Sequence, residues 1–311
     1  MKFAKRMERF GEGIFSQLAE KKQKRLAEGA EVVDLSIGAP NIPPAQHILD
    51  ALCESAGDKN NYIYAINDQK ALLEAVSQWY ERRYGVELDP QTEICSLLGS
   101  QEGLAHIALS IVDEGDLVLV PDPCYPVFAD GPRLAGAELY YMPQKKENGY
   151  IIQLSEIPEE VAQRAKFMIV SYPNNPTTAV ADRKFYEKLV LWAREHNIIV
   201  LHDNAYSDIM LNGEKGLSFL SIPGAKEVGI EFNSLSKTYN LTGMRVSFAL
   251  GNREVISRFR AFRSQIDYGM FYPIMAGAAA ALNGPQDVVE SNRTGYMARR
   301  DALCGGLRSI G

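Results

Sequence analysis

The chain has 311 residues, of which 46% are hydrophobic and 23% charged, an ordinary composition for a globular protein with a large core. Its 33 lysines and arginines against 39 acidic residues give a net charge of −6 without a basic run, so nucleic acid is not an expected partner. The longest apolar stretch, at 273–282, is far shorter than the ~20 residues of a membrane-spanning helix, so no membrane partner is expected.

The amino terminus and the cysteines both favour a cytoplasmic protein. Charges interrupt the apolar residues of 1–15, so this segment lacks the continuous apolar core of a signal peptide. The four cysteines are scattered without CxxC spacing, which favours reduced thiols over a disulfide framework or a zinc site. His106 and His202 lie outside any HExxH or other ligand spacing and are interpreted as ordinary residues, so no metal is expected.

From about Thr92 onward, short β-branched runs alternate with helical patterns. This alternation predicts an α/β fold with a mostly parallel sheet flanked by helices. The predicted strands cover 92–98, 116–120, 166–172, 197–203 and 227–235, and helical spacing occupies 104–112 and 185–196 between them.

Polar, glycine-containing or proline-containing segments follow all five predicted strands. These segments begin at Gly99, Pro121, Pro173, Asp203 and Ser234. Ligands bind at the carboxyl ends of the strands in open parallel sheets, so we expect the five segments to surround one pocket.

Two of the segments suit a phosphate. Ser100 and Gln101 begin a predicted helix, whose first amides and partial positive charge bind anions. Ser234, Ser236 and Arg245 add two hydroxyls and a bidentate guanidinium.

The other segments supply the remaining parts of a coenzyme site. Tyr125 offers an aromatic face, Asp203 a carboxylate at the end of an apolar strand, Tyr206 a phenol and Asn175 an amide. Each of these side chains alone has an ordinary structural interpretation, such as a helix cap for Asp203. Together with the single lysine in SLSKTYNLTGMR, Lys237, they indicate a site for pyridoxal 5′-phosphate (PLP).

The ordered set of segments resembles the aspartate-aminotransferase superfamily of PLP enzymes. The residues that carry the resemblance are GSQEG (99–103), PDPCYP (121–126), SYPNNPT (171–177), LHDNAYSD (201–208) and SLSKTYNLTGMR (234–245). Weaker similarity covers the rest of the chain, including DLSIGAPN at 34–41. Within the superfamily the sequence is most similar to the LL-diaminopimelate aminotransferase group and its alanine-aminotransferase relatives.

The resemblance implies a role for each residue. Lys237 would bind PLP covalently and move a proton between the substrate α-carbon and the coenzyme, and Asp203 would hold the ring nitrogen protonated. Tyr206 and Asn175 would contact the ring oxygen, with Asn175 also near the substrate, and Tyr125 would stack on the ring. The phosphate would bind Ser100, Gln101, Ser234, Ser236 and Arg245. Gly38 would lie near the substrate carboxylate.

Two positions differ from the family pattern. Thr178 stands where the family usually has glycine, from which we expect a changed turn rather than a lost contact. The family also sends a tyrosine to the neighbouring subunit's phosphate, and the usual spacing falls on Ile63, between Tyr62 and Tyr64, with Asp68 in place of a glycine. Tyr64 is the preferred candidate, and a homodimer is expected.

The resemblance also implies a domain division and an incomplete small domain. Residues 1–45 would be its amino-terminal segment, 46–285 the large PLP-binding domain, and 286–311 the beginning of its carboxyl-terminal part. Family members continue beyond the equivalent of Gly311 with an arginine for the substrate carboxylate, and no arginine of this sequence is assigned that role.

The expected reaction is transamination between an amino acid and a 2-oxo acid, with a diaminopimelate-, alanine- or glutamate-type donor and 2-oxoglutarate as acceptor. Two alternatives stay open. One is a PLP-dependent β-lyase on the same fold, because one fold hosts several chemistries. The other is a catalytically impaired PLP-binding protein that lacks the carboxylate-binding arginine.

Overall fold

The computed structural model describes residues 1–211 and 213–311, which form two compact units, residues 1–41 and 42–311. The first unit contains η1 (Lys5–Arg9) and α1 (Ile14–Ala27), which has no buried residue. An ion pair of 2.8 Å between Lys22 Nζ and Asp34 Oδ2 ties α1 to the extended segment that follows it. The finer division of the chain near residues 45 and 285 stays a prediction.

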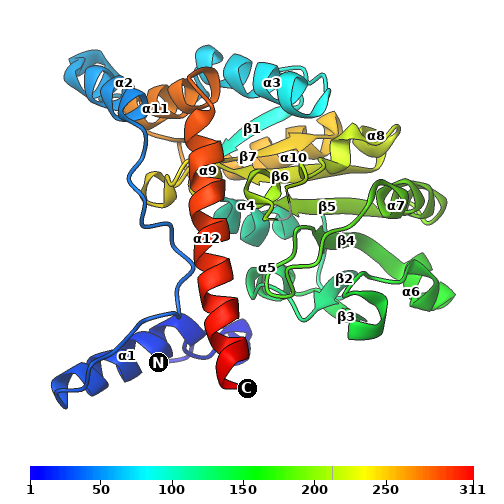
Figure 1. Cartoon of the computed structure of the whole chain (residues 1–311). Coiled ribbons are helices and arrows are strands. Elements are labelled where there is room, and N and C mark those ends of the chain that lie inside the picture. Colours follow the sequence, from blue (N-terminus) through cyan, green and yellow to red (C-terminus); the bar gives the residue numbers. More distant parts are fainter. Residues whose placement is uncertain (212) are drawn as a thin grey trace. The chain divides into compact units, whose positions relative to one another are not determined.

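The second unit is built around a seven-stranded sheet in the order β1-β7-β6-β5-β4-β2-β3, as far as the described residues extend (Figure 1). The strands are β1 (Ile94–Leu97), β2 (Leu117–Asp122), β3 (Glu138–Pro143), β4 (Ala165–Ser171), β5 (Ile199–Asn204), β6 (Gly229–Ser234) and β7 (Ser247–Gly251). Only β7 runs against its neighbours, β1 and β6, and all other pairs are parallel. The predicted α/β class with a mostly parallel sheet is confirmed.

All five predicted strands are present, with shifted ends. In the run 227–235 the first two residues belong to α8 (Ala225–Val228), and the strand starts at Gly229. A Cβ at Gly229 would come within 2.3 Å of the Val200 carbonyl oxygen, so glycine permits the close approach of β6 to β5. Strands β3 and β7 were not predicted.

Helices cover both faces of the sheet, so most strands are buried on both sides. The longer helices of this unit are α2 (Gln46–Gly57), α3 (Lys70–Tyr84), α4 (Ser100–Ile107), α5 (Val127–Leu134), α6 (Glu159–Arg164), α7 (Arg183–Glu195), α10 (Arg253–Arg263), α11 (Tyr272–Asn283) and α12 (Asp287–Ile310). Along β4, Phe167 and Ile169 belong to the same buried cluster as residues of α4, α5 and α10, whereas Met168 and Val170 belong to the cluster that contains residues of α3, α7 and α11. This alternation follows from the two-residue period of a strand.

The first half of α12 packs against the segment that carries Lys237. Asn292 is buried and donates to the Thr238 carbonyl oxygen at 3.4 Å, and the Tyr296 hydroxyl donates to Asn240 Oδ1 at 3.2 Å. These bonds fix the backbone on the carboxyl side of Lys237. In the described part of the chain, every helix is too short or too polar to cross a bilayer.

Candidate functional site

The five strands β1, β2, β4, β5 and β6 point in the same direction. The last four pair in parallel through the sheet, and β1 has the same direction because both β1 and β6 are antiparallel to β7. Their carboxyl ends therefore share one edge of the sheet. The segments expected to surround one pocket all leave the sheet at that edge.

The anion-binding corner lies at the end of β1. Gly99 is buried, has φ 95°, and precedes the first residue of α4, Ser100. The Arg245 guanidinium lies against it, because a Cβ at Gly99 would come within 2.1 Å of Arg245 Nη2. A positive side chain and the amino end of a helix thus meet at one point, which suits an anion such as a phosphate.

Ser234 is the last residue of β6, and Ser236 follows it by two positions. Ser234 caps the short helix α9 (Leu235–Thr238), because its Oγ accepts a hydrogen bond from the Ser236 amide at 3.2 Å. Both side chains are buried. The cap gives the turn before Lys237 a defined backbone conformation.

Lys237 is half-buried on α9. Burial lowers the pKa of its amine, and the positive charge of Arg245 lowers it further. A lowered pKa increases the neutral fraction of the amine near neutral pH, which is the form that attacks a carbonyl group.

Asp203 is buried near the end of β5 and its carboxylate is incompletely satisfied. Burial raises its pKa to about 6, against opposing effects from His202 and the Ser171 hydroxyl. Ser171 lies beside Asp203 in the parallel register, yet Asp203 Oδ1 has no hydrogen-bond partner among the described residues. A buried carboxylate oxygen of this kind needs a donor, and a protonated ring nitrogen would supply one.

Tyr206 and Asn175 lie next to each other, one from the segment after β5 and one from that after β4. Burial and the nearby Asp203 charge raise the pKa of the Tyr206 phenol to about 12, against the opposing effect of a hydrogen bond with the Asn175 side chain. The pair offers a phenol and an amide close to the Asp203 carboxylate.

Tyr125 completes this group. Its hydroxyl donates to Gln101 Oε1 at 2.8 Å, which links the end of β2 to the first turn of α4. Burial and the nearby Asp203 carboxylate raise the pKa of Tyr125, whereas Arg245 lowers it. The charges of both Asp203 and Arg245 therefore act on one phenol, as expected for residues that line one site.

The turn that holds Asn175 keeps two backbone hydrogen bonds. The Asn174 amide donates to the Ala179 carbonyl oxygen and the Thr178 amide donates to the Asn174 carbonyl oxygen, both at 2.9 Å. Thr178 has φ 63°, in the left-handed region that favours glycine. Asn175 therefore keeps its contact with Tyr206 although the turn that holds it contains Thr178, a β-branched residue in an unfavourable backbone conformation.

Two other residues predicted for the site, Tyr64 and Gly38, are exposed. Tyr64 is 75% exposed, and its ring packs edge-on against Tyr268 with centroids 5.3 Å apart. Tyr62 uses its hydroxyl within its own chain, donating to the Ala56 carbonyl oxygen at 2.8 Å. Gly38 is an exposed residue of the amino-terminal unit.

Sequence reasoning missed two features near the site. Ser171 was contained in the predicted strand 166–172, but only the parallel register places it beside Asp203. Glu231 was treated as one more residue of a strand run, although it is fully buried and binds His202. The described residues contain no group of three or more His, Cys, Asp or Glu side chains that could hold a metal ion.

Comparisons with known proteins agree on one family. The profile of the family described as aminotransferase class I and II matches residues 30–311. An LL-diaminopimelate aminotransferase from Dehalococcoides mccartyi is 46% identical over 312 aligned residues, covering all of this chain and 80% of the relative.

Solved structures are similar over nearly the whole chain. A substrate-bound structure of BacF from Bacillus subtilis has a TM-score of 0.94 at 37% identity, covering 98% of this chain and 78% of that one. A probable N-succinyldiaminopimelate aminotransferase from Thermus thermophilus has a TM-score of 0.90 at 37% identity, covering 96% and 80%.

Proposed function

Because the chain belongs to the class I and II aminotransferases, which are PLP-dependent transferases, we propose that the strand-end residues hold PLP and that the substrate is a diaminopimelate-type amino acid. The observation that supports the coenzyme assignment most strongly is Asp203 Oδ1, a buried carboxylate oxygen that lacks a donor among the described residues.

PLP supplies an aldehyde for the amino group and a ring that stores the electrons of a carbanion. Asp203 would hold the ring nitrogen protonated, and this contact would give its Oδ1 the missing donor. Tyr206 and Asn175, which contact each other, would bind the ring oxygen. Tyr125 would cover one face of the ring, in an orientation set by its bond to Gln101.

The phosphate would lie in the corner between α4 and Arg245. Ser100 and Gln101 begin the helix there, and the Arg245 guanidinium lies against Gly99. Ser234 and Ser236 would add hydroxyl donors from the end of β6. Charge-assisted bonds of this kind are among the stronger interactions available to a phosphate.

Lys237 would act twice in the reaction. Its amine, whose pKa is lowered by burial and by Arg245, would first bind the coenzyme covalently. After the substrate displaces it, the same amine would take a proton from the substrate α-carbon and return one to the coenzyme, as a general base and acid.

The substrate assignment rests on the 46% identity to an LL-diaminopimelate aminotransferase across the whole of this chain. We propose diaminopimelate as the amino acid and 2-oxoglutarate with glutamate as the second pair. Gly38 would lie near the substrate carboxylate.

An amino-donor panel on the PLP-loaded chain tests this function. Diaminopimelate and glutamate should discharge the visible band of bound PLP, and 2-oxoglutarate should restore it, with Lys237→Ala as a control that forms no such band. If diaminopimelate is inert while alanine or glutamate reacts, the substrate assignment is wrong. Turnover that releases ammonia without any 2-oxo acid would indicate a β-lyase.

We also propose a homodimer, in which Tyr64 reaches the phosphate of the neighbouring subunit. An exposed apolar patch supports it, made of Tyr62, Ile63, Tyr64, Ile66 and Tyr268, with Ile66 73% exposed. Patches of contiguous exposed apolar side chains mark interaction sites. The Tyr62 hydroxyl already bonds Ala56, whereas Tyr64 contacts Tyr268 through its ring.

Light scattering and coenzyme titration test the dimer. Ile66→Glu should give a monomer. Tyr64→Phe should weaken PLP binding and leave pyridoxal binding unchanged, whereas the matched Tyr62→Phe variant should bind PLP normally. Equal effects of the two phenylalanine variants would overturn the assignment of Tyr64.

We further propose a cytoplasmic location, which the four free cysteines support.

A further inference from the structure

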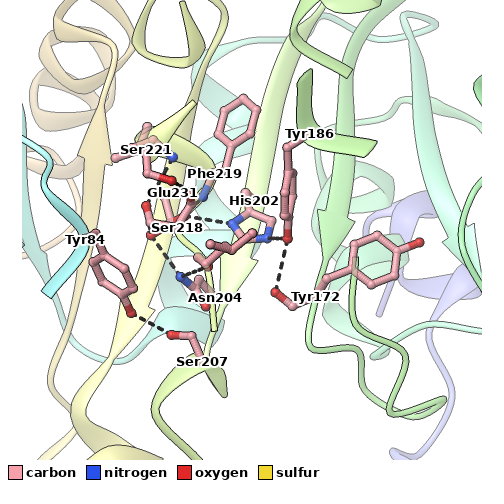
Figure 2. A network of polar contacts seen from close by, with 12 residues as sticks. Tyr84, Tyr172, Tyr186, His202, Asn204, Ser207, Ser218, Phe219, Ser221 and Glu231 are labelled. Carbon is pink, nitrogen blue, oxygen red and sulfur yellow. Dashed lines mark hydrogen bonds and ion pairs between the residues drawn. The ribbon is translucent and has the colours of Figure 1, made fainter. Parts of the chain in front are cut away.

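A buried carboxylate, Glu231 on β6, lies opposite His202 of β5 and has five hydrogen-bond partners. Figure 2 shows Glu231 with His202, Asn204, Ser218 and Phe219 around it. Its Oε1 accepts from the Tyr80 hydroxyl at 2.7 Å, Asn204 Nδ2 at 3.0 Å and the Ser218 hydroxyl at 2.9 Å. Its Oε2 accepts from the Phe219 amide at 2.8 Å and contacts His202 Nδ1 at 2.9 Å.

These partners allow Glu231 to stay ionised although it is fully buried. Burial alone would raise its pKa, but the bonds from His202, Asn204 and Tyr80 outweigh burial and the pKa lies below its ordinary value. Hydrogen bonds to the charged form are what allow a carboxylate to stay charged without contact with water.

The position of two of these donors connects Glu231 to the site. His202 and Asn204 are the residues immediately before and after Asp203 on β5. Because side chains alternate along a strand, both point to the face opposite that of Asp203. The parallel register pairs His202 with Glu231 directly. One side chain on β6 therefore holds both neighbours of Asp203.

A second set of bonds holds His202 from its other side. The Tyr186 hydroxyl lies 3.0 Å from His202 Nε2 and donates to the Tyr172 carbonyl oxygen at 3.4 Å, which connects the ring to α7 and to the residue that follows β4. Figure 2 shows Tyr186, His202 and Glu231 in one line of contacts. The imidazole is therefore fixed at both nitrogens.

We propose that Glu231 is a positioning residue for Asp203: through His202 and Asn204 it fixes the strand end that presents the Asp203 carboxylate to the ring nitrogen of PLP. The inference rests on the proposed role of Asp203 in coenzyme binding. A carboxylate that must meet one ring nitrogen works only if its backbone cannot shift, and groups behind a site commonly provide that restraint.

Matched variants separate positioning from simple stability. Glu231→Gln keeps the shape of the side chain but replaces one acceptor with a donor. Asn204→Ala and Ser218→Ala each remove one donor from the same oxygen, Glu231 Oε1, but only Asn204 adjoins Asp203. If Glu231→Gln does not fold, the comparison of Asn204→Ala with Ser218→Ala decides whether the bonds to Glu231 position Asp203.

The first measurement is amide hydrogen exchange across β5 in the coenzyme-free protein. Exchange at Asp203 and its neighbours should rise in Glu231→Gln and in Asn204→Ala, and should stay at the wild-type rate in Ser218→Ala. Because this measurement needs no PLP, it tests the restraint even if the proposed function is wrong. Wild-type exchange in a folded Glu231→Gln variant would overturn the proposal.

The second measurement is the ¹⁵N chemical shift of PLP labelled at the ring nitrogen, which reports whether that nitrogen is protonated. Glu231→Gln and Asn204→Ala should move the signal toward the unprotonated position and weaken PLP binding on the order of tenfold, the effect of one charge-assisted hydrogen bond. Ser218→Ala should leave both unchanged. If Ser218→Ala changed the ¹⁵N signal and the PLP affinity equally, Glu231 would have only a structural role. Absence of PLP from the wild-type chain would instead contradict the proposed function.

Discussion

The Arg245 guanidinium occupies the space that a side chain on Gly99 would need, since a Cβ there would lie 2.1 Å from Arg245 Nη2. The glycine at the end of β1 and the arginine before β7 therefore form one feature. A phosphate at this corner requires both the open amino end of α4 and the arginine beside it.

Gly99→Ala should weaken PLP binding by more than about tenfold, because the new methyl group would displace Arg245 from the phosphate corner. Gly115→Ala is the matched control, because Gly115 also has a positive φ, 89°, but an added Cβ there meets open space. The measurement is the affinity for PLP and for pyridoxal, which lacks the phosphate. Equal weakening for the two ligands, or for the two variants, would contradict the assignment.

The buried Asp203 carboxylate should make the coenzyme-free protein less stable as the pH rises. Its pKa is about 6, against an ordinary value of 3.8, so the folded state holds the proton more tightly than the unfolded state. Ionisation of Asp203 therefore lowers the free energy of unfolding. This loss of stability is absent below pH 3.8, grows between pH 3.8 and 6, and is complete above pH 6, where it reaches at most about 3 kcal/mol.

Asp203→Asn removes this titration and should stabilise the coenzyme-free protein at pH 8 while leaving it nearly unchanged at pH 4. Urea unfolding at the two pH values measures the difference, and Asp113→Asn, at an exposed loop position, serves as the control. The same variant should lose most of its PLP affinity. A variant that is no more stable at pH 8 than the wild type would show that the carboxylate is not destabilising.

Thr178 should be a source of strain that glycine relieves. A β-branched residue at φ 63° is unfavourable, so Thr178→Gly should raise the free energy of unfolding by up to about 1 kcal/mol, after the entropy that glycine adds to the unfolded chain. Thr178→Ala removes the same side-chain atoms but keeps a Cβ, and should give little gain. Equal stability of the two variants would show that the backbone angle costs nothing.

The sequence predicted the strands that carry polar segments at their ends and missed the two that do not. β7 is five residues long, and its antiparallel direction has no signature in the run SFALG. β3 lies at the edge of the sheet and is partly exposed, so its run ELYYMP lacks the apolar pattern of the central strands. Tertiary pairing, rather than local propensity, decides both.

The candidate site was predictable because its residues follow strands one after another in the chain. The group around Glu231 was not, because it joins Tyr80, His202 and Ser218 from separate parts of the sequence. From the sequence, His202 is interpreted as an ordinary residue because it lies outside any metal-ligand spacing. Only the register of β5 against β6 shows that it lies opposite Glu231.

The most direct test of the central claim is to locate the covalent attachment of PLP. The purified chain would be loaded with PLP, reduced with borohydride, digested and analysed by mass spectrometry. We expect one pyridoxyl group on Lys237, together with its absence from Lys237→Ala. Attachment to other lysines alone, or equal labelling of the wild type and the variant, would show that the strand-end residues do not form a PLP site around Lys237.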